Sequence, residues 1–151
     1  MIDRIEIARL HSLPFGFERL RDEAAQQGFG FLDRLLADWA SGANTFIGPG
    51  ECLLGAFVGD RLVGIGGLNA DPYSPRTDLG RIRHVYVLEA WRHNGVGRAL
   101  IDGLVRQARG RFGELRLRTG TTGAAAFYAH CGFGPVNDPT ASHAFKLAQC
   151  P

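Results

Sequence analysis

The sequence contains little cysteine, and the cysteines it has do not form an obvious pattern. Its 3 cysteines, Cys52, Cys131 and Cys150, are odd in number and far apart, and no two have the spacing of metal ligands. This pattern predicts reduced thiols in a cytoplasmic protein, with neither a disulfide framework nor a metal site.

Long apolar segments and basic stripes are also missing. No apolar run approaches the roughly 18 residues of a membrane-spanning helix, and residues 1–6 hold no apolar stretch typical of a signal peptide. The formal net charge is only +2, and we interpret the arginines between 106 and 118 as a solvated face. We therefore expect neither a membrane nor a nucleic acid among the partners.

The composition is that of an ordinary globular protein. Hydrophobic residues make up 45% and charged residues 21% of the 151 residues, which favours a single domain over 1–151. Hydrophobic periodicity and turn residues place helices and strands in alternation, and a long polar loop is expected at 69–80. Expected helices are at 15–27, 31–40, 96–108 and 122–130; expected strands begin near Ile5 and run over 52–58, 61–68, 81–88, 114–119 and 144–147.

The most informative segment is the turn Arg-His-Asn-Gly-Val-Gly at 92–97. It follows an apolar strand and precedes an amphipathic helix, so backbone N–H groups meet there at the positive end of a helix dipole. Gly95 and Gly97 leave room for a ligand to approach the backbone, which predicts a pyrophosphate site. A dinucleotide fold needs a third glycine where Leu100 stands, and a P-loop needs Gly-Lys-Ser/Thr, so neither fits.

Two segments carry the signature of one family. The pattern Arg/Gln-x-x-Gly-x-Gly/Ala matches 92–97, and an alanine-rich helical turn with an aromatic residue, tyrosine and Gly-Phe matches 124–133. In these segments the sequence resembles the GNAT-superfamily N-acetyltransferases. The resemblance implies an α/β fold with one mixed, mostly antiparallel central sheet, a splayed central strand and about four flanking helices.

The resemblance also implies acetyl-CoA as cosubstrate, without a metal. The backbone of the splayed strand at Val85, Tyr86 and Val87 is expected to bind the pantetheine arm as an added strand. Thr121 stands where relatives often carry an asparagine that contacts the pantetheine, and it either replaces this contact or leaves it to water. The residues expected at the pyrophosphate are Arg92, His93, Asn94, Gly95, Val96, Gly97 and Arg98.

Tyr128 matches the position of the family's general acid. A tyrosine hydroxyl within reach can protonate the thiolate that leaves when the acyl group is transferred. Cys131 is close in sequence but has no neighbouring base to activate it, so we interpret it as a small core residue.

The general base is the point where the sequence departs from the family. The two strand positions where relatives carry a glutamate hold Arg81 and Arg116. His84 on the central strand is the candidate base, because a near-neutral imidazole can accept a proton. Glu51, Glu89 and a chain of water molecules stay open as alternatives.

We expect an N-acetyltransferase in which a primary amine attacks the thioester directly in a ternary complex, with a small molecule as acceptor. Polyamines, amino acids, aminoglycosides, other small amines and protein amines all stay open, as does a homodimer. A non-catalytic acetyl-CoA sensor on the same fold is the alternative, since a fold does not fix a function. Side chains that could attract or line an amine are Asp33, Asp38, Asp71 and Asp78, and Phe29, Phe31, Trp39 and Tyr73.

Overall fold

The computed structural model describes residues 4–147, so Cys150 lies outside the described part. Seven strands and four helices alternate along the chain, and a short 3-10 helix, η1 (Glu89–Trp91), follows the fourth strand. The helices are α1 (Phe17–Gln26), α2 (Phe31–Ser41), α3 (Val96–Ala108) and α4 (Thr122–His130). The strands are β1 (Ile5–Arg9), β2 (Cys52–Val58), β3 (Arg61–Ala70), β4 (Leu79–Val87), β5 (Glu114–Leu117), β6 (Gly134–Asp138) and β7 (Ala141–Lys146).

All seven strands form one sheet in the order β1-β2-β3-β4-β5-β7-β6. Only β4 and β5 pair in parallel, and every other neighbouring pair is antiparallel. This arrangement confirms the expected mixed, mostly antiparallel sheet. Within residues 4–147 no helix is both long and apolar enough to cross a membrane.

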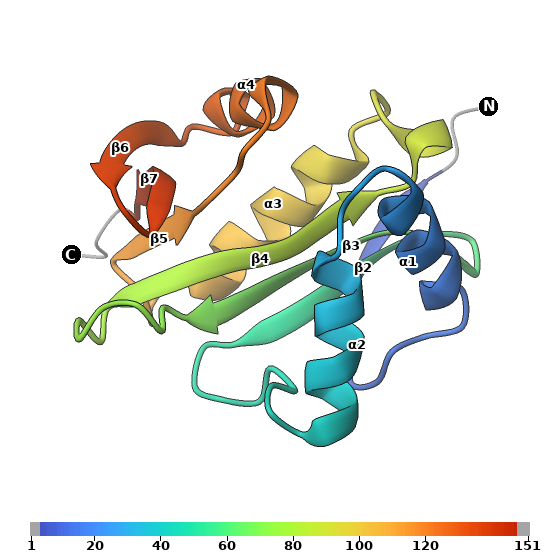
Figure 1. Cartoon of the computed structure of the whole chain (residues 1–151), viewed down its shortest axis with the longest axis horizontal. Helices are drawn as coiled ribbons and strands as arrows, with labels where there is room; N and C mark the ends of the chain where they lie inside the picture. Colours follow the sequence, from blue (N-terminus) through green and yellow to red (C-terminus); the bar gives the residue numbers. More distant parts are fainter. Residues whose placement is uncertain (1–3, 148–151) are drawn as a thin grey trace.

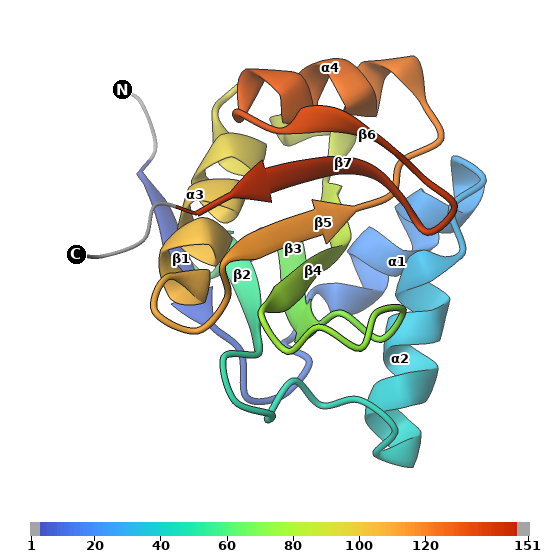
Figure 2. The same cartoon turned by 90° about the vertical axis from the view of Figure 1, so that its left-hand side faces the viewer.

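Two hydrophobic layers enclose the sheet, one on each face. The helix α3 lies on one face, and α1 and α2 lie on the other, as Figure 2 shows. The apolar positions of α3 recur with helical spacing and are buried, so one side of this helix is committed to the sheet. These buried positions are Val96, Leu100, Ile101, Leu104, Val105 and Ala108.

The pairing of β4 with β5 is short, and it leaves part of β4 without a neighbour on that side. The strands pair at only three positions, from Leu79 opposite Glu114 to Arg81 opposite Arg116. Beyond them β4 continues to Val87, whereas β5 ends at Leu117 and the chain leads into α4. Figure 1 shows the two strands diverging, which leaves one edge of the second half of β4 without a partner strand.

A bulge interrupts the pairing of β4 with β3 in this second half of β4. Gly67 pairs with Arg83 and Ile65 with Tyr86, so two residues of β4, His84 and Val85, stand opposite one residue of β3. His84 has a φ of 61°, a left-handed conformation that is uncommon for a residue other than glycine. The bulge changes which side chains of β4 face the helices.

Two sequence predictions at the ends of strands are wrong. The polar loop expected at 69–80 is shorter, because β3 continues through Ala70 and β4 begins at Leu79. Asn69 is held in the strand by a pair of side-chain amide hydrogen bonds with Asn44, of 2.9 and 3.0 Å. Near the C-terminal end, β7 begins at Ala141 rather than at residue 144, and β6 covers Gly134–Asp138, a segment outside the expected strands.

The remaining loop contains two ion pairs that differ in burial. Arg81 Nε donates to Asp71 Oδ2 at 3.1 Å, and these side chains are 6% and 2% exposed. Arg76 pairs with Asp78 at 2.9 Å, and these side chains are 46% and 52% exposed. Only the first pair is costly to break, because water can solvate the members of the second.

We expect Asp71→Asn to lower the free energy of unfolding by roughly 3 kcal/mol, since it leaves the Arg81 charge buried without a counterion. Asp78→Asn is the matched control and should leave the urea midpoint unchanged. Urea denaturation followed by circular dichroism measures both. Equal midpoints for the wild type and Asp71→Asn would contradict a structural role for the buried pair.

Candidate active site

A cleft of about 1220 Å³ opens where β4 and β5 diverge. Its walls come from α2, the second half of β4, the start of α3, the end of β5, α4 and the β6–β7 turn. The lining residues that the sequence analysis had singled out as site residues are His84, Val85, Tyr86, Val87, Arg92, His93, Gly95, Val96, Gly97, Arg98, Thr121 and Tyr128. The exception is Asn94, whose side-chain amide donates to the Arg92 carbonyl at 2.9 Å and which does not line the cleft.

The start of α3 presents unused hydrogen-bond donors to this cleft. His93 and Gly95 both have positive φ, 64° and 83°, so the chain turns tightly before the helix. No side chain caps α3, and the backbone N–H groups of residues 93–98 find no acceptor among the described residues. The first turn also lacks an acidic residue. Such a row of free amides at a helix N-terminus binds an anion.

The structure explains why position 97 is glycine by packing against α4, whereas the sequence suggested room for a ligand. A Cβ at this position would lie 3.0 Å from the ring of Phe127 on α4. Close packing between α3 and α4 therefore requires the small residue, whatever ligand approaches the turn. Gly95 differs, because open space surrounds it and its positive φ is what favours glycine.

The two arginines of the turn have protein partners. Arg92 donates to the Val87 carbonyl at 3.0 Å and to Gln27 at 2.9 Å, so it ties the end of β4 to α1. Arg98 pairs with Asp102 at 3.2 Å and donates to the His130 carbonyl at 3.1 Å, and its side chain is more than half exposed. Water competes with both contacts, so Arg98 is less firmly held than Arg92.

A polar network also fixes Tyr86 on the other face of β4. Its hydroxyl donates to Glu23 Oε2 on α1 at 2.6 Å, and the same carboxylate oxygen accepts the Glu89 N–H at 2.9 Å. Burial and the Glu23 carboxylate raise the pKa of Tyr86 above its ordinary value. Tyr86 is thus a structural tie rather than a free acid, and no local sequence pattern predicts this contact across 63 residues.

Tyr128 lies at the opposite wall of the cleft and is buried as a residue, with 9% of its surface exposed. Its ring packs edge-on against Phe127 and Phe133, and its hydroxyl makes no hydrogen bond with any described residue. Burial raises the pKa of Tyr128, so it stays protonated at neutral pH. Thr121 caps the same helix by accepting the Ala124 N–H at 3.2 Å, which leaves its hydroxyl proton free to donate.

His84 is the unusual group in the cleft. It is 7% exposed, its ring lies edge-on to Phe46, and neither ring nitrogen has a hydrogen-bond partner among the described residues. Burial, reinforced by Arg83, lowers its pKa to about 4; Arg34 acts in the same direction, and the Phe31 backbone and Asp38 act in the opposite one. The imidazole is therefore neutral at pH 7 and offers one nitrogen as an acceptor.

No carboxylate lines the cleft. Glu51 accepts the backbone N–H groups of Gly48 and Ala70, and Glu89 accepts from Gln27, so both serve neighbouring loops. What the sequence analysis missed is the pair Arg34 and Arg83, which does line it. Among residues 4–147 no three His, Cys, Asp or Glu side chains gather as a group that could hold a metal ion.

Comparison with known proteins agrees with this architecture. The sequence profile described as "Acetyltransferase (GNAT) family" matches residues 7–133. A crystal structure from Exiguobacterium sp. 255-15, assigned as an acetyltransferase, is 27% identical with a TM-score of 0.84 over 95% of this chain and 93% of that one. No functionally curated protein matches the sequence significantly.

Two more distant structures share the fold. A GNAT-family acetyltransferase from Staphylococcus aureus Mu50 is 15% identical, with a TM-score of 0.75 over 96% of this chain and 100% of that one. An aminoglycoside 6'-N-acetyltransferase, solved in complex with coenzyme A, is 14% identical, with a TM-score of 0.71 over 97% and 99% of the two chains.

The low pKa of His84 predicts a specific pH dependence of stability. In the unfolded chain the pKa returns to about 6.5, so the unfolded state binds more protons than the folded state between that pH and about pH 4. The contribution of His84 to the free energy of unfolding is therefore fully present above pH 6.5 and is lost as the pH falls below that value. We expect this histidine to account for a loss of about 2 kcal/mol between pH 7 and pH 5.

The test compares the wild type with His84→Asn, because asparagine tolerates the positive φ and does not titrate. Urea unfolding at pH 7 and at pH 5 should show a smaller loss of stability in the variant. If both proteins lose the same amount, the imidazole is not held neutral in the fold.

Proposed function

Because the chain belongs to the acetyltransferase (GNAT) family, we propose that it transfers an acetyl group from acetyl-CoA to a primary amine. The observation that carries this proposal is the juxtaposition of the free amides at the start of α3, the unpaired edge of β4 and the Tyr128 hydroxyl around one cleft. When bound, acetyl-CoA supplies an acetyl group activated as a thioester.

The residues present suit coenzyme A. The N–H groups of residues 93–98 suit the pyrophosphate, and Arg98 adds a positive charge that its exposed partner Asp102 does not fix. The edge of β4 at Val85, Tyr86 and Val87 suits the pantetheine arm, because amide-bearing chains bind open strand edges through backbone hydrogen bonds. The same backbone N–H groups can stabilise negative charge on the thioester oxygen.

Tyr128 serves in this proposal as the general acid. Its hydroxyl is protonated at neutral pH, lacks a protein acceptor and lines the cleft opposite β4. These properties suit a group that donates its proton to the departing sulfur. Packing by Phe127 and Phe133 holds the ring in one orientation.

His84 serves as the acceptor of a hydrogen bond from the attacking amine. A pKa of about 4 makes it a weak base for an ammonium ion, so we propose that it orients a neutral amine rather than deprotonating a charged one. An ammonium ion loses one proton to water before the attack. The proton that the nitrogen loses on amide formation replaces the one that Tyr128 gives to the sulfur. His84 is assigned this orienting role because its ring nitrogens have no partner among the described residues and no carboxylate is among the lining residues.

The alternative is an acetyl-CoA sensor without turnover, and the missing carboxylate base favours it. A sensor would have no use for a hydroxyl without a partner among the described residues at the position of a leaving-group acid. We therefore favour an acetyltransferase over a sensor, and the next experiment distinguishes the two functions.

We expect Tyr128→Phe to lower kcat by roughly 100-fold while the KM for acetyl-CoA stays within about two-fold, since only proton donation is lost. The measurement is thiol release from acetyl-CoA with the best primary amine of a panel. Phe133→Leu is the control for altered ring packing and should lower thermal stability more than kcat. An unchanged kcat in Tyr128→Phe would remove the assigned role, and tight acetyl-CoA binding without turnover on any amine would favour the sensor.

A further inference from the structure

Away from the start of α3, the cleft carries more positive charge than negative charge. Four arginines line it from three elements: Arg34 on α2, Arg81 and Arg83 on β4, and Arg118 just after β5. No aspartate or glutamate is among the lining residues. A site that attracts amines by charge alone would have the opposite composition.

Of these four arginines, Arg81 is held by several protein groups, whereas the other three have few partners or none among the described residues. Arg81 is neutralised by Asp71, donates to the Thr140 carbonyl at 2.9 Å and lies 4.7 Å over the Tyr73 ring. Arg34 and Arg83, by contrast, make no hydrogen bond or ion pair with any described residue. Arg118 donates only to the Pro139 carbonyl, at 3.1 Å.

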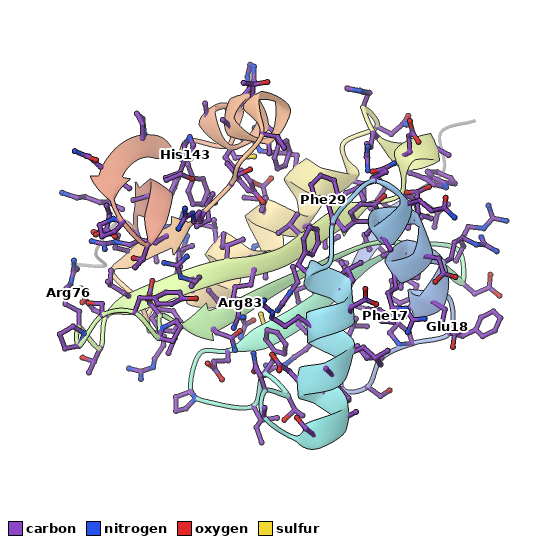
Figure 3. All side chains as sticks on the ribbon, viewed as in Figure 1. Phe17, Glu18, Phe29, Arg76, Arg83 and His143 are labelled. Carbon is purple, nitrogen blue, oxygen red and sulfur yellow. The ribbon has the colours of Figure 1, made fainter. Side chains whose placement is uncertain are left out.

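Arg83 points to the side of the sheet that faces away from α3. Its cross-strand partner is Gly67, and a Cβ on Gly67 would meet Phe46, which packs with α1 and α2. Directly paired residues share a face, so Arg83 lies on the α2 side, as Figure 3 also shows. Val85, within the bulge, and Val87, after it, pack towards α3 instead.

This placement makes Arg83 and Arg34 unsuitable partners for the pyrophosphate. The free amides and Arg98 lie at the start of α3, beyond the C-terminal end of β4, whereas Arg83 lies within the strand and faces α2. A second anion therefore has to be considered, on the side where the acceptor enters. Phe29, Phe31 and Tyr73 add aromatic surface around this part of the cleft.

We propose that the acceptor is a primary amine that also carries an oxyanion, either a carboxylate or a phosphate, which Arg83 and Arg34 bind. The proposal rests on the proposed acetyltransferase function and specifies its substrate class. Guanidinium groups bind planar carboxylates and phosphate oxygens in pairs of hydrogen bonds, which orients the molecule as well as attracting it. His84 follows Arg83 on β4, and its ring nitrogens have no hydrogen-bond partner among the described residues.

The same charges disfavour multiply charged cationic acceptors. Polyamines and aminoglycosides would bring further positive charge next to arginines that have no counterion in the described protein. The four aspartates that the sequence offered as attractants do not line the cleft. Asp71 and Asp78 pair with arginines, and Asp33 lies 3.5 Å from Arg21. Asp38 lies one helical turn from Arg34 on α2 and close enough to act on His84, but it forms no ion pair among the described residues.

The test uses pairs of acceptors that differ only in the oxyanion. Phenylalanine is compared with phenylalanine amide and phenethylamine, and O-phosphoethanolamine with ethanolamine; spermidine represents the cationic amines. Thiol release from acetyl-CoA gives kcat/KM for each. We expect the member with the oxyanion to be favoured by roughly 100-fold in at least one pair, and the favoured pair tells carboxylate from phosphate.

Arginine variants then test which residues bind the oxyanion. Arg83→Gln should remove most of the preference for acceptors with an oxyanion by lowering kcat/KM for these acceptors alone. Arg34→Gln provides a second variant on a different element. Arg61→Gln, on an exposed arginine outside the cleft, is the matched control and should change nothing.

The outcomes separate this inference from the function on which it rests. Equal or better turnover of neutral or cationic amines would overturn the anionic acceptor and leave the acetyltransferase intact. If no amine turns over, calorimetric binding of the anionic members to wild type but not to Arg83→Gln would support the oxyanion site and count against catalysis. Neither turnover nor binding would overturn both.

Discussion

The separation of β4 from β5 is the constraint on which the rest of the site depends. After three paired positions the strands part, and the backbone edge of β4 loses its partner exactly where the cleft begins. Buried backbone groups need partners, so such an open edge persists only where a ligand or water can satisfy it. The bulge at His84 and the free amides of α3 lie along the same opening.

The elements around the opening are fixed by contacts that do not involve a ligand. Arg92 and Tyr86 tie the end of β4 to α1 through Gln27 and Glu23, while Gly97 lets α3 pack against Phe127 of α4. These contacts hold both walls in position without a ligand, and a site ordered in advance costs less entropy to assemble. The cleft between them has free N–H groups at one end and, at the other, guanidinium groups without an ion pair among the described residues.

Local patterns predict much of this architecture. The helical spacing of α3, the tight turn at Gly95 and the positions of Tyr128 and His84 are visible in the sequence, and the structure gathers these residues around one cleft. Features that depend on distant partners are not visible. The extension of β3 depends on Asn44, and the position of Val85 on the opposite face from Arg83 depends on a bulge that no local pattern marks.

Amide hydrogen exchange with and without acetyl-CoA tests the central claim most directly. If the opened edge of β4 and the start of α3 hold the coenzyme, exchange should slow at residues 83–87 and 93–98 and stay unchanged along β1 at the far edge of the sheet. Saturating binding that leaves both segments unprotected, or that protects a different surface, would contradict the account.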